Sequence, residues 1–91
     1  MKVEQFIHAN QFHLYGEGKD CLQSYNSLVV EISNGKITLG RDWEYSTTTS
    51  KHVYQFLETY GNFYIPYGQN KRAYINKAIK NGEIIYNEEM C

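Results

Sequence analysis

Histidines and cysteines are the residues of this chain best suited to holding a metal ion or attacking a substrate. A structural zinc site takes about four such ligands at short spacings. Only His8 and His13 lie near each other in the sequence, and His52 stands beside Lys51 in a segment expected to be helical and exposed. The spacing therefore predicts no metal site and no bound cofactor.

Cys21 could act as a nucleophile if a histidine lay beside it in the fold. No local pattern supports that pairing, and a lone cysteine is more often a small buried apolar side chain. Cys91 is the last residue of the sequence. Because the sequence shows neither a secretory leader nor a long apolar run, we expect a reducing, cytoplasmic environment and unpaired thiols.

Asp42 and Glu44 flank the single tryptophan, Trp43, and would share one face of an extended segment. Two neighbouring carboxyl groups can perform acid–base chemistry when one is held protonated and the other ionised. In the structural alternative, Asp42 orders the chain at this corner and Glu44 pairs with Arg41 or Lys51. We predict the structural role, and hence a protein that is not an enzyme.

Two further patterns are similar to ligand-binding loops but fit structural roles better. Gly16 and Gly18 lack the third glycine and the strand-to-helix context of a dinucleotide-binding loop, so they predict a turn. The hydroxyl-rich residues 46–50 supply N-cap candidates for a following helix. Anion binding at that helix N-terminus is the alternative.

Basic residues gather in a second predicted helix, residues 71–81, which follows two tyrosines. The candidate binding residues are Tyr64, Tyr67, Lys71, Arg72, Lys77 and Lys80. Aromatic rings stack on bases while cations track phosphates, so this segment could contact nucleic acid. A solvated helix face is the ordinary explanation. The net charge of −1 argues against a strong grip on nucleic acid, which needs a basic excess.

The strongest folding signal is the pair Asn34 and Gly35, which tolerates the positive φ angles of a two-residue hairpin turn. With this pair as the loop, Val30 faces Leu39, and Ile32 faces Ile37. The predicted apolar face consists of Leu28, Val30, Ile32, Ile37 and Leu39, with Val29 as its exception. Turn chemistry and alternation therefore agree on one register.

After the hairpin, the chain is predicted to turn a corner and enter a helix over residues 49–60, which ends at Gly61. Apolar residues follow helical spacing at Val53, Phe56, Leu57 and Tyr60. We expect this helix to cover the apolar face of the hairpin. Structural roles at the corner and the helix start are assigned to Trp43, Tyr45, Thr48 and Thr49.

The whole chain, residues 1–91, is predicted to form a single α+β domain. It would hold an antiparallel sheet of about four strands in a meander, with two helices packed on one face. Residues 11–15 and 20–25 supply the other two strands. Residues 1–9 read as either a helical turn or an edge strand, residues 62–66 as a connector or an edge strand, and residues 82–86 as a further strand.

Two motifs stand out between residues 12 and 60. The first is Ser24-Tyr25-Asn26-Ser27, and the second runs from Arg41 through Trp43, Tyr45 and Ser46 to the Thr-Thr pair. They resemble a family of small uncharacterised proteins encoded by phages and other mobile elements of Gram-positive bacteria, whose pattern is an S-Y-N-S/T strand before a W-D/E-Y-S-x-T-T core. The resemblance implies a phage context and carries over no activity or catalytic residue.

Nine tyrosines are the compositional outlier of the chain. Tyrosine suits both small cores and binding surfaces, because it buries area and keeps a polar tip. With the resemblance, this favours a non-enzymatic phage accessory protein that binds a host or phage protein in the host cytoplasm, for example to inhibit a bacterial defence system or a host enzyme. The alternative is a nucleic-acid-binding accessory protein that uses the basic helix. No membrane association is expected, and open sheet edges would allow a homodimer.

Overall fold

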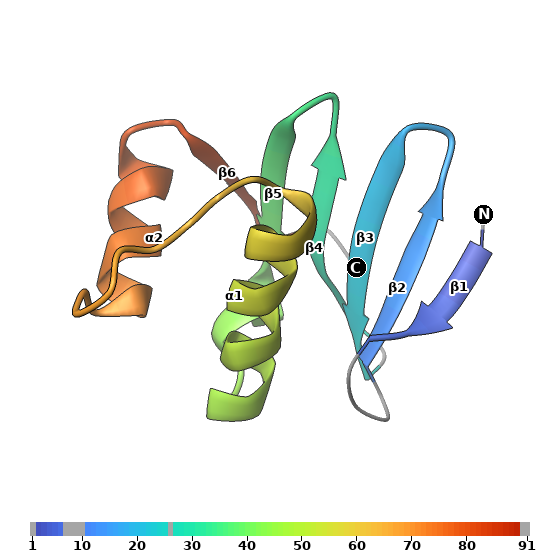
Figure 1. The fold of residues 1–91 in the computed structure, drawn as a ribbon, viewed down its shortest axis with the longest axis horizontal. Helices are drawn as coiled ribbons and strands as arrows, with labels where there is room; N and C mark the ends of the chain where they lie inside the picture. The colour runs from blue at the N-terminus through green and yellow to red at the C-terminus, as the bar shows by residue number, and fades with distance from the viewer. Residues whose placement is uncertain (1, 7–10, 26, 90–91) are drawn as a thin grey trace.

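The computed structural model describes residues 2–6, 11–25 and 27–89, which form an α+β fold around one six-stranded sheet (Figure 1). The strands are β1 (Lys2–Gln5), β2 (Gln11–Gly16), β3 (Lys19–Ser24), β4 (Ser27–Ser33), β5 (Lys36–Gly40) and β6 (Ile84–Asn87). The helices are the 3-10 turn η1 (Arg41–Glu44), α1 (Thr47–Tyr60) and α2 (Lys71–Lys80). The strands lie side by side in sequence order.

The sheet has more strands than the predicted four or so, and it is mixed rather than purely antiparallel. The central meander β2 to β5 is antiparallel as expected, and β1 adds an antiparallel edge strand beside β2. β6 returns from α2 and pairs parallel to β5. The sequence signal for both outer strands is weak because each is only four residues long and mostly exposed. Residues 62–66 form a connector and no strand.

The hairpin between β4 and β5 has the predicted register, with Val30 opposite Leu39 and Ile32 opposite Ile37. Asn34 and Gly35 occupy the turn with φ angles of 54° and 77°. The hairpin between β2 and β3 is equally tight, because Gly16 pairs with Lys19 around a two-residue turn. Local turn chemistry therefore decides both connections.

A β-bulge between β3 and β4 breaks the alternation that the sequence predicts. Leu22 pairs with Val30 and Gln23 pairs with Leu28, so Val29 has no opposite residue. Val29 and Val30 are both fully buried, whereas Leu28 is partly exposed and lies outside the core cluster. Leu28 was wrongly assigned to the apolar face because the extra residue, Val29, reverses the faces of the β4 residues that precede it, while Val30 and Ile32 keep their predicted places.

Helix α1 packs across the sheet through its buried residues Val53, Phe56 and Leu57, and lies in front of β4 and β5 in Figure 1. It begins two residues before the predicted start, because Ser46 Oγ accepts a 3.1 Å hydrogen bond from the Thr49 amide and acts as the N-cap. Trp43, in η1, is buried in the same core. The prediction that this helix covers the apolar face of the β4–β5 hairpin is therefore confirmed.

Helix α2 lies beside β6 and joins the same hydrophobic cluster through Ile75 and Ala78 (Figure 1). Asn70 caps its start, and Gly82, with φ of 83°, follows its end, as predicted. The Glu83 amide donates to the Ala78 carbonyl at 2.9 Å, which completes a Schellman motif. None of the described helices is long and apolar enough to cross a membrane.

Candidate binding site

The two sequence motifs meet in space and line one open hollow of about 560 Å³. We call it the motif hollow. Ser24, Tyr25 and Ser27 come from the first motif, and Asp42, Tyr45, Ser46 and Thr49 come from the second motif, with Val29 also in the wall. The described residues at the end of β3 and the start of β4 supply one side, and η1 with the first turn of α1 supplies the other. Segments that are separate in sequence thus build a single concave surface.

A hydrogen bond ties the two sides of the motif hollow together. Ser27 Oγ donates to Asp42 Oδ2 at 2.9 Å, and Asp42 Oδ1 lies 3.9 Å from Arg41 Nε. Because residues 41–44 form a 3-10 turn, Asp42 and Glu44 do not share a strand face as the sequence predicted. Asp42 lines the hollow, as an acid–base residue would need, but Glu44 pairs instead with Arg72 at 2.9 Å.

Hydroxyl groups form a chain through the wall of the hollow. Buried Gln11 donates from Nε2 to Ser24 Oγ at 2.9 Å, and Ser24 Oγ lies 3.2 Å from Thr49 Oγ1. Ser46 Oγ also donates to Thr49 Oγ1 at 3.2 Å. Because these side chains hold one another, the polar wall is preorganised rather than mobile.

Two exposed tyrosines stand on the rim. Tyr25 keeps 55% of its surface exposed and Tyr45 keeps 78%. Tyr25 has a φ of 55°, which is a left-handed conformation. Asparagine adopts this conformation readily, as Asn34 does here, whereas a bulky aromatic residue rarely does. Such strain costs roughly 1–3 kcal/mol and concentrates at functional sites. Neither residue was singled out for binding from the sequence, although a tyrosine in a tight turn is a readable signal.

The residues selected from the sequence for binding lie apart from the motif hollow. Tyr64 and Tyr67 are exposed in the connection between α1 and α2. Lys71 Nζ lies 5.5 Å from the centre of the Tyr54 ring, and Arg72 holds the ion pair with Glu44. Lys77 and Lys80 are exposed in the last turn of α2. None of these residues lines the hollow.

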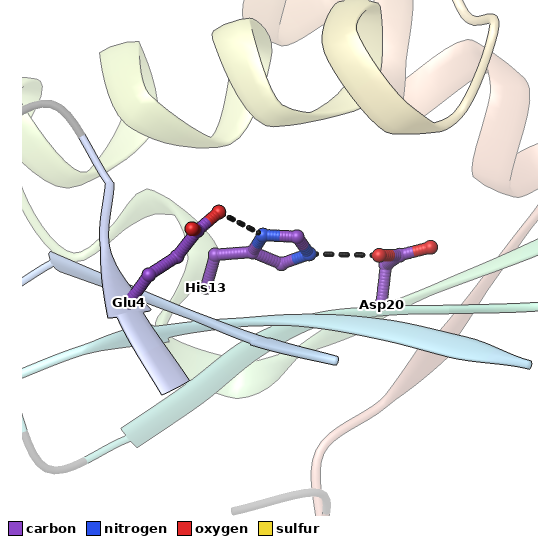
Figure 2. A network of polar contacts seen from close by, with 3 residues as sticks. All are labelled: Glu4, His13 and Asp20. Atoms are coloured by element: carbon purple, nitrogen blue, oxygen red, sulfur yellow. Dashed lines mark hydrogen bonds and ion pairs between the residues drawn. The ribbon is translucent and has the colours of Figure 1, made fainter. Parts of the chain in front are cut away.

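A second polar cluster centres on the buried His13 (Figure 2). Its Nδ1 lies 2.9 Å from Glu4 Oε1, and its Nε2 lies 2.7 Å from Asp20 Oδ1. The Tyr60 and Tyr15 rings lie 4.2 Å and 4.8 Å from the imidazole centre. The Phe56 ring lies 5.4 Å away as well. Because both ring nitrogens are engaged and aromatic rings surround the imidazole, this histidine links β2 to β1 and β3 rather than facing a substrate.

The other histidines and the C-terminal cysteine are further candidates for metal ligands. Within the described part of the chain, no group of three or more histidine, cysteine or carboxylate side chains could hold a metal. His52 is buried, which corrects the expected exposure, because it lies on the inward side of α1 with Val53 and Phe56. His8 and Cys91 lie outside the described residues.

Cys21 is a buried free thiol, as predicted. Burial, with a smaller contribution from the Glu31 carboxylate, raises its pKa above the usual 9.0. The thiolate is the reactive form of cysteine, so this side chain is a poor nucleophile near neutral pH.

A family model matches residues 1–82, and its description is "Family of unknown function (DUF8033)". The chain belongs to this family of unknown function. The match covers both motifs and every element from β1 to α2, which agrees with the expectation of an uncharacterised family. No curated protein and no solved structure matches the chain. The phage context stays a prediction.

Proposed function

We propose that this protein is a non-enzymatic accessory protein that binds another protein through the motif hollow. The supporting observation is the convergence of both motifs on one concave surface whose rim carries Tyr25 and Tyr45. Exposed tyrosines are frequent anchors of protein interfaces, because they bury much area at low entropic cost. The strained φ of Tyr25 adds support, since folding alone would favour asparagine or glycine there.

The partner we propose is a bacterial host or phage protein in the host cytoplasm. Inhibition of a defence system or a host enzyme is the form of action that suits a small protein with one rigid patch. The Ser24–Thr49, Ser46–Thr49 and Ser27–Asp42 contacts join the two backbone segments that carry the rim tyrosines. Preorganisation lowers the entropic cost of association, so a small surface suffices.

Capture of partners from a Gram-positive host lysate tests the proposal. We expect wild-type protein to retain a defined partner, and Tyr25→Asn and Tyr45→Ala each to lose most of it. Tyr67→Ala is the control, because Tyr67 is also an exposed tyrosine but does not line the hollow. Tyr25→Asn should also raise stability by about 1 kcal/mol by relieving the left-handed tyrosine.

Two results would reject the proposed function. The first is a lysate capture with nothing above background. The second is partner loss with Tyr67→Ala while Tyr25→Asn and Tyr45→Ala still bind, which would move the interface to the connection between the helices.

The second candidate function is nucleic-acid binding through α2. It is supported by the exposure of Lys71, Arg72, Lys77 and Lys80, although Glu44 already neutralises Arg72. Salt-dependent retention of labelled single-stranded or duplex DNA is the test. Replacing all four basic residues by alanine should abolish the retention, and retention that survives would remove α2 as the site.

A further inference from the structure

The motif hollow has a chemical character that narrows what its partner presents. Its wall combines serine and threonine hydroxyls, two tyrosines and one carboxylate, that of Asp42. The described lining residues include no lysine, arginine or histidine. The hollow is therefore complementary to a cation that also offers several hydrogen-bond donors.

Asp42 retains capacity for such a ligand. Its side chain is 35% exposed, and Ser27 occupies only one of its oxygens with a 2.9 Å bond. The Arg41 Nε, at 3.9 Å from the other oxygen, is too distant for a hydrogen bond and belongs to a side chain that is 70% exposed. A carboxylate offers about four acceptor positions, so Asp42 can accept further donors from within the hollow.

The rim favours a planar cation over a compact one. Tyr25 and Tyr45 are both exposed where the hollow opens. A guanidinium group stacks on aromatic rings and presents five donors in a fixed plane, whereas an ammonium group is a strongly hydrated point charge. The half-buried Ser46 hydroxyl oxygen has one acceptor position left for a donor that Asp42 does not bind.

We propose that the motif hollow binds an arginine side chain of the protein partner, with Asp42 as the counter-ion and Tyr25 and Tyr45 as aromatic walls. This inference rests on the proposed function and names what the hollow recognises. The N-terminus of α1 carries a partial positive charge of about half an elementary charge, which is smaller than the charge of the Asp42 carboxylate. Ser46 Oγ also already accepts from the Thr49 amide, so the anion-binding capacity of that turn is reduced.

The direct test titrates the protein with N-acetyl-arginine amide and follows backbone amide shifts by NMR. We expect shifts concentrated at Tyr25, Tyr45, Ser46 and Thr49. N-acetyl-citrulline amide, which has the same shape without the charge, should bind about three- to fivefold more weakly, the range of a partly exposed ion pair. Inorganic phosphate should not compete for the same residues.

Asp42→Asn is the discriminating variant, because asparagine keeps an oxygen that can accept from Ser27 but loses the charge and replaces the other acceptor oxygen by an NH2 donor. We expect this variant to bind N-acetyl-arginine amide only as tightly as the wild type binds N-acetyl-citrulline amide. Its amide spectrum should remain that of a folded protein. Arg41→Ala should strengthen binding about twofold, because it removes a competing cation. Equal binding of arginine and citrulline, an unchanged affinity in Asp42→Asn, or phosphate shifting these amides instead of arginine would each overturn the assignment.

The results also separate this inference from the proposed function. If Tyr25→Asn abolishes partner capture but arginine amide does not bind, the protein-binding function stands and the arginine assignment fails. If arginine amide binds the hollow but no partner is captured from lysate, the proposed function fails and the ligand chemistry stands.

Discussion

Ser27 and Asp42, fifteen positions apart in the sequence, are joined by a 2.9 Å hydrogen bond from the serine hydroxyl to the carboxylate. This contact links the start of β4 to η1, and both residues line the motif hollow. The first motif supplies the serine of this bond and the second motif supplies the aspartate, so the arrangement of each motif depends on the other.

Removal of this contact should destabilise the fold measurably. We expect Ser27→Ala to lower the free energy of unfolding by about 1 kcal/mol, because a partly buried carboxylate loses a donor. Urea denaturation measures the change. Ser33→Ala, at the other end of the same strand, is the control, and an equal loss in both variants would show that the Asp42 contact contributes nothing specific.

The His13 cluster should hold the edge strand β1 in place. His13→Phe keeps an aromatic ring between Tyr15 and Tyr60 but removes both carboxylate contacts. We expect a loss of roughly 1–3 kcal/mol and faster amide exchange in β1, because Glu4 and Asp20 lose their partner. Hydrogen exchange followed by NMR is the measurement.

Glu4→Gln provides the comparison for His13→Phe, since Glu4 is half exposed and glutamine can still reach the ring. Its effect should be the smaller of the two. Unchanged exchange of the β1 amides in His13→Phe would show that backbone pairing with β2 alone retains this strand.

Gly61 should tolerate no side chain. A Cβ built there would lie 2.9 Å from the Leu57 carbonyl oxygen and 3.2 Å from the Cδ1 atoms of Ile32 and Ile37. Its φ of −101° is ordinary, so the requirement for glycine comes from close approach to the sheet rather than from a left-handed turn. The sequence predicted glycine at the helix end, but Asn62, with φ of 52°, adopts the left-handed conformation.

We expect Gly61→Ala to cost roughly 1–3 kcal/mol through displacement of well-packed neighbours. Thermal or urea denaturation checks this value. The exposed Glu58→Ala on the same helix should change stability by less than about 0.5 kcal/mol. A Gly61→Ala protein as stable as the Glu58→Ala protein would contradict the packing argument.

Tyr60 should make stability fall at alkaline pH. Burial raises its pKa above 10.0, and the Glu4 carboxylate adds to the shift. A group whose folded pKa is raised stabilises the fold fully below its unfolded pKa, and this contribution is lost as pH rises through the folded value. Urea midpoints measured from about pH 8 upwards should therefore decline less steeply in Tyr60→Phe than in wild type.

Tyr67→Phe is the matched control for that titration, because Tyr67 is fully exposed. Its midpoints should follow those of the wild type. If Tyr60→Phe declined as steeply as the wild type above pH 10.0, the environment of Tyr60 could not be the source of the alkaline loss.

Cys21 should react slowly with thiol reagents. In a Cys91→Ser background, we expect Ellman's reagent to modify native Cys21 at least about tenfold more slowly than the same thiol in urea, because burial both hides it and raises its pKa. Equal rates in the two states would indicate that β3 opens readily.

Local chemistry alone predicts a large part of this fold. The Asn34-Gly35 turn places Val30 opposite Leu39, and Asn70 and Gly82 bound the second helix as their residue types require. These features depend on residues a few positions apart, whose backbone preferences act before any distant contact forms.

The tertiary structure decided the rest, because the deciding contacts join residues far apart in the chain. No local pattern places β6 parallel to β5, leaves Val29 unpaired in a bulge, or brings Glu44 to Arg72. The motif hollow is the clearest case. Each motif is visible in the sequence, but the concave surface exists only where packing of α1 on the sheet brings Ser24 to Thr49 and Ser27 to Asp42.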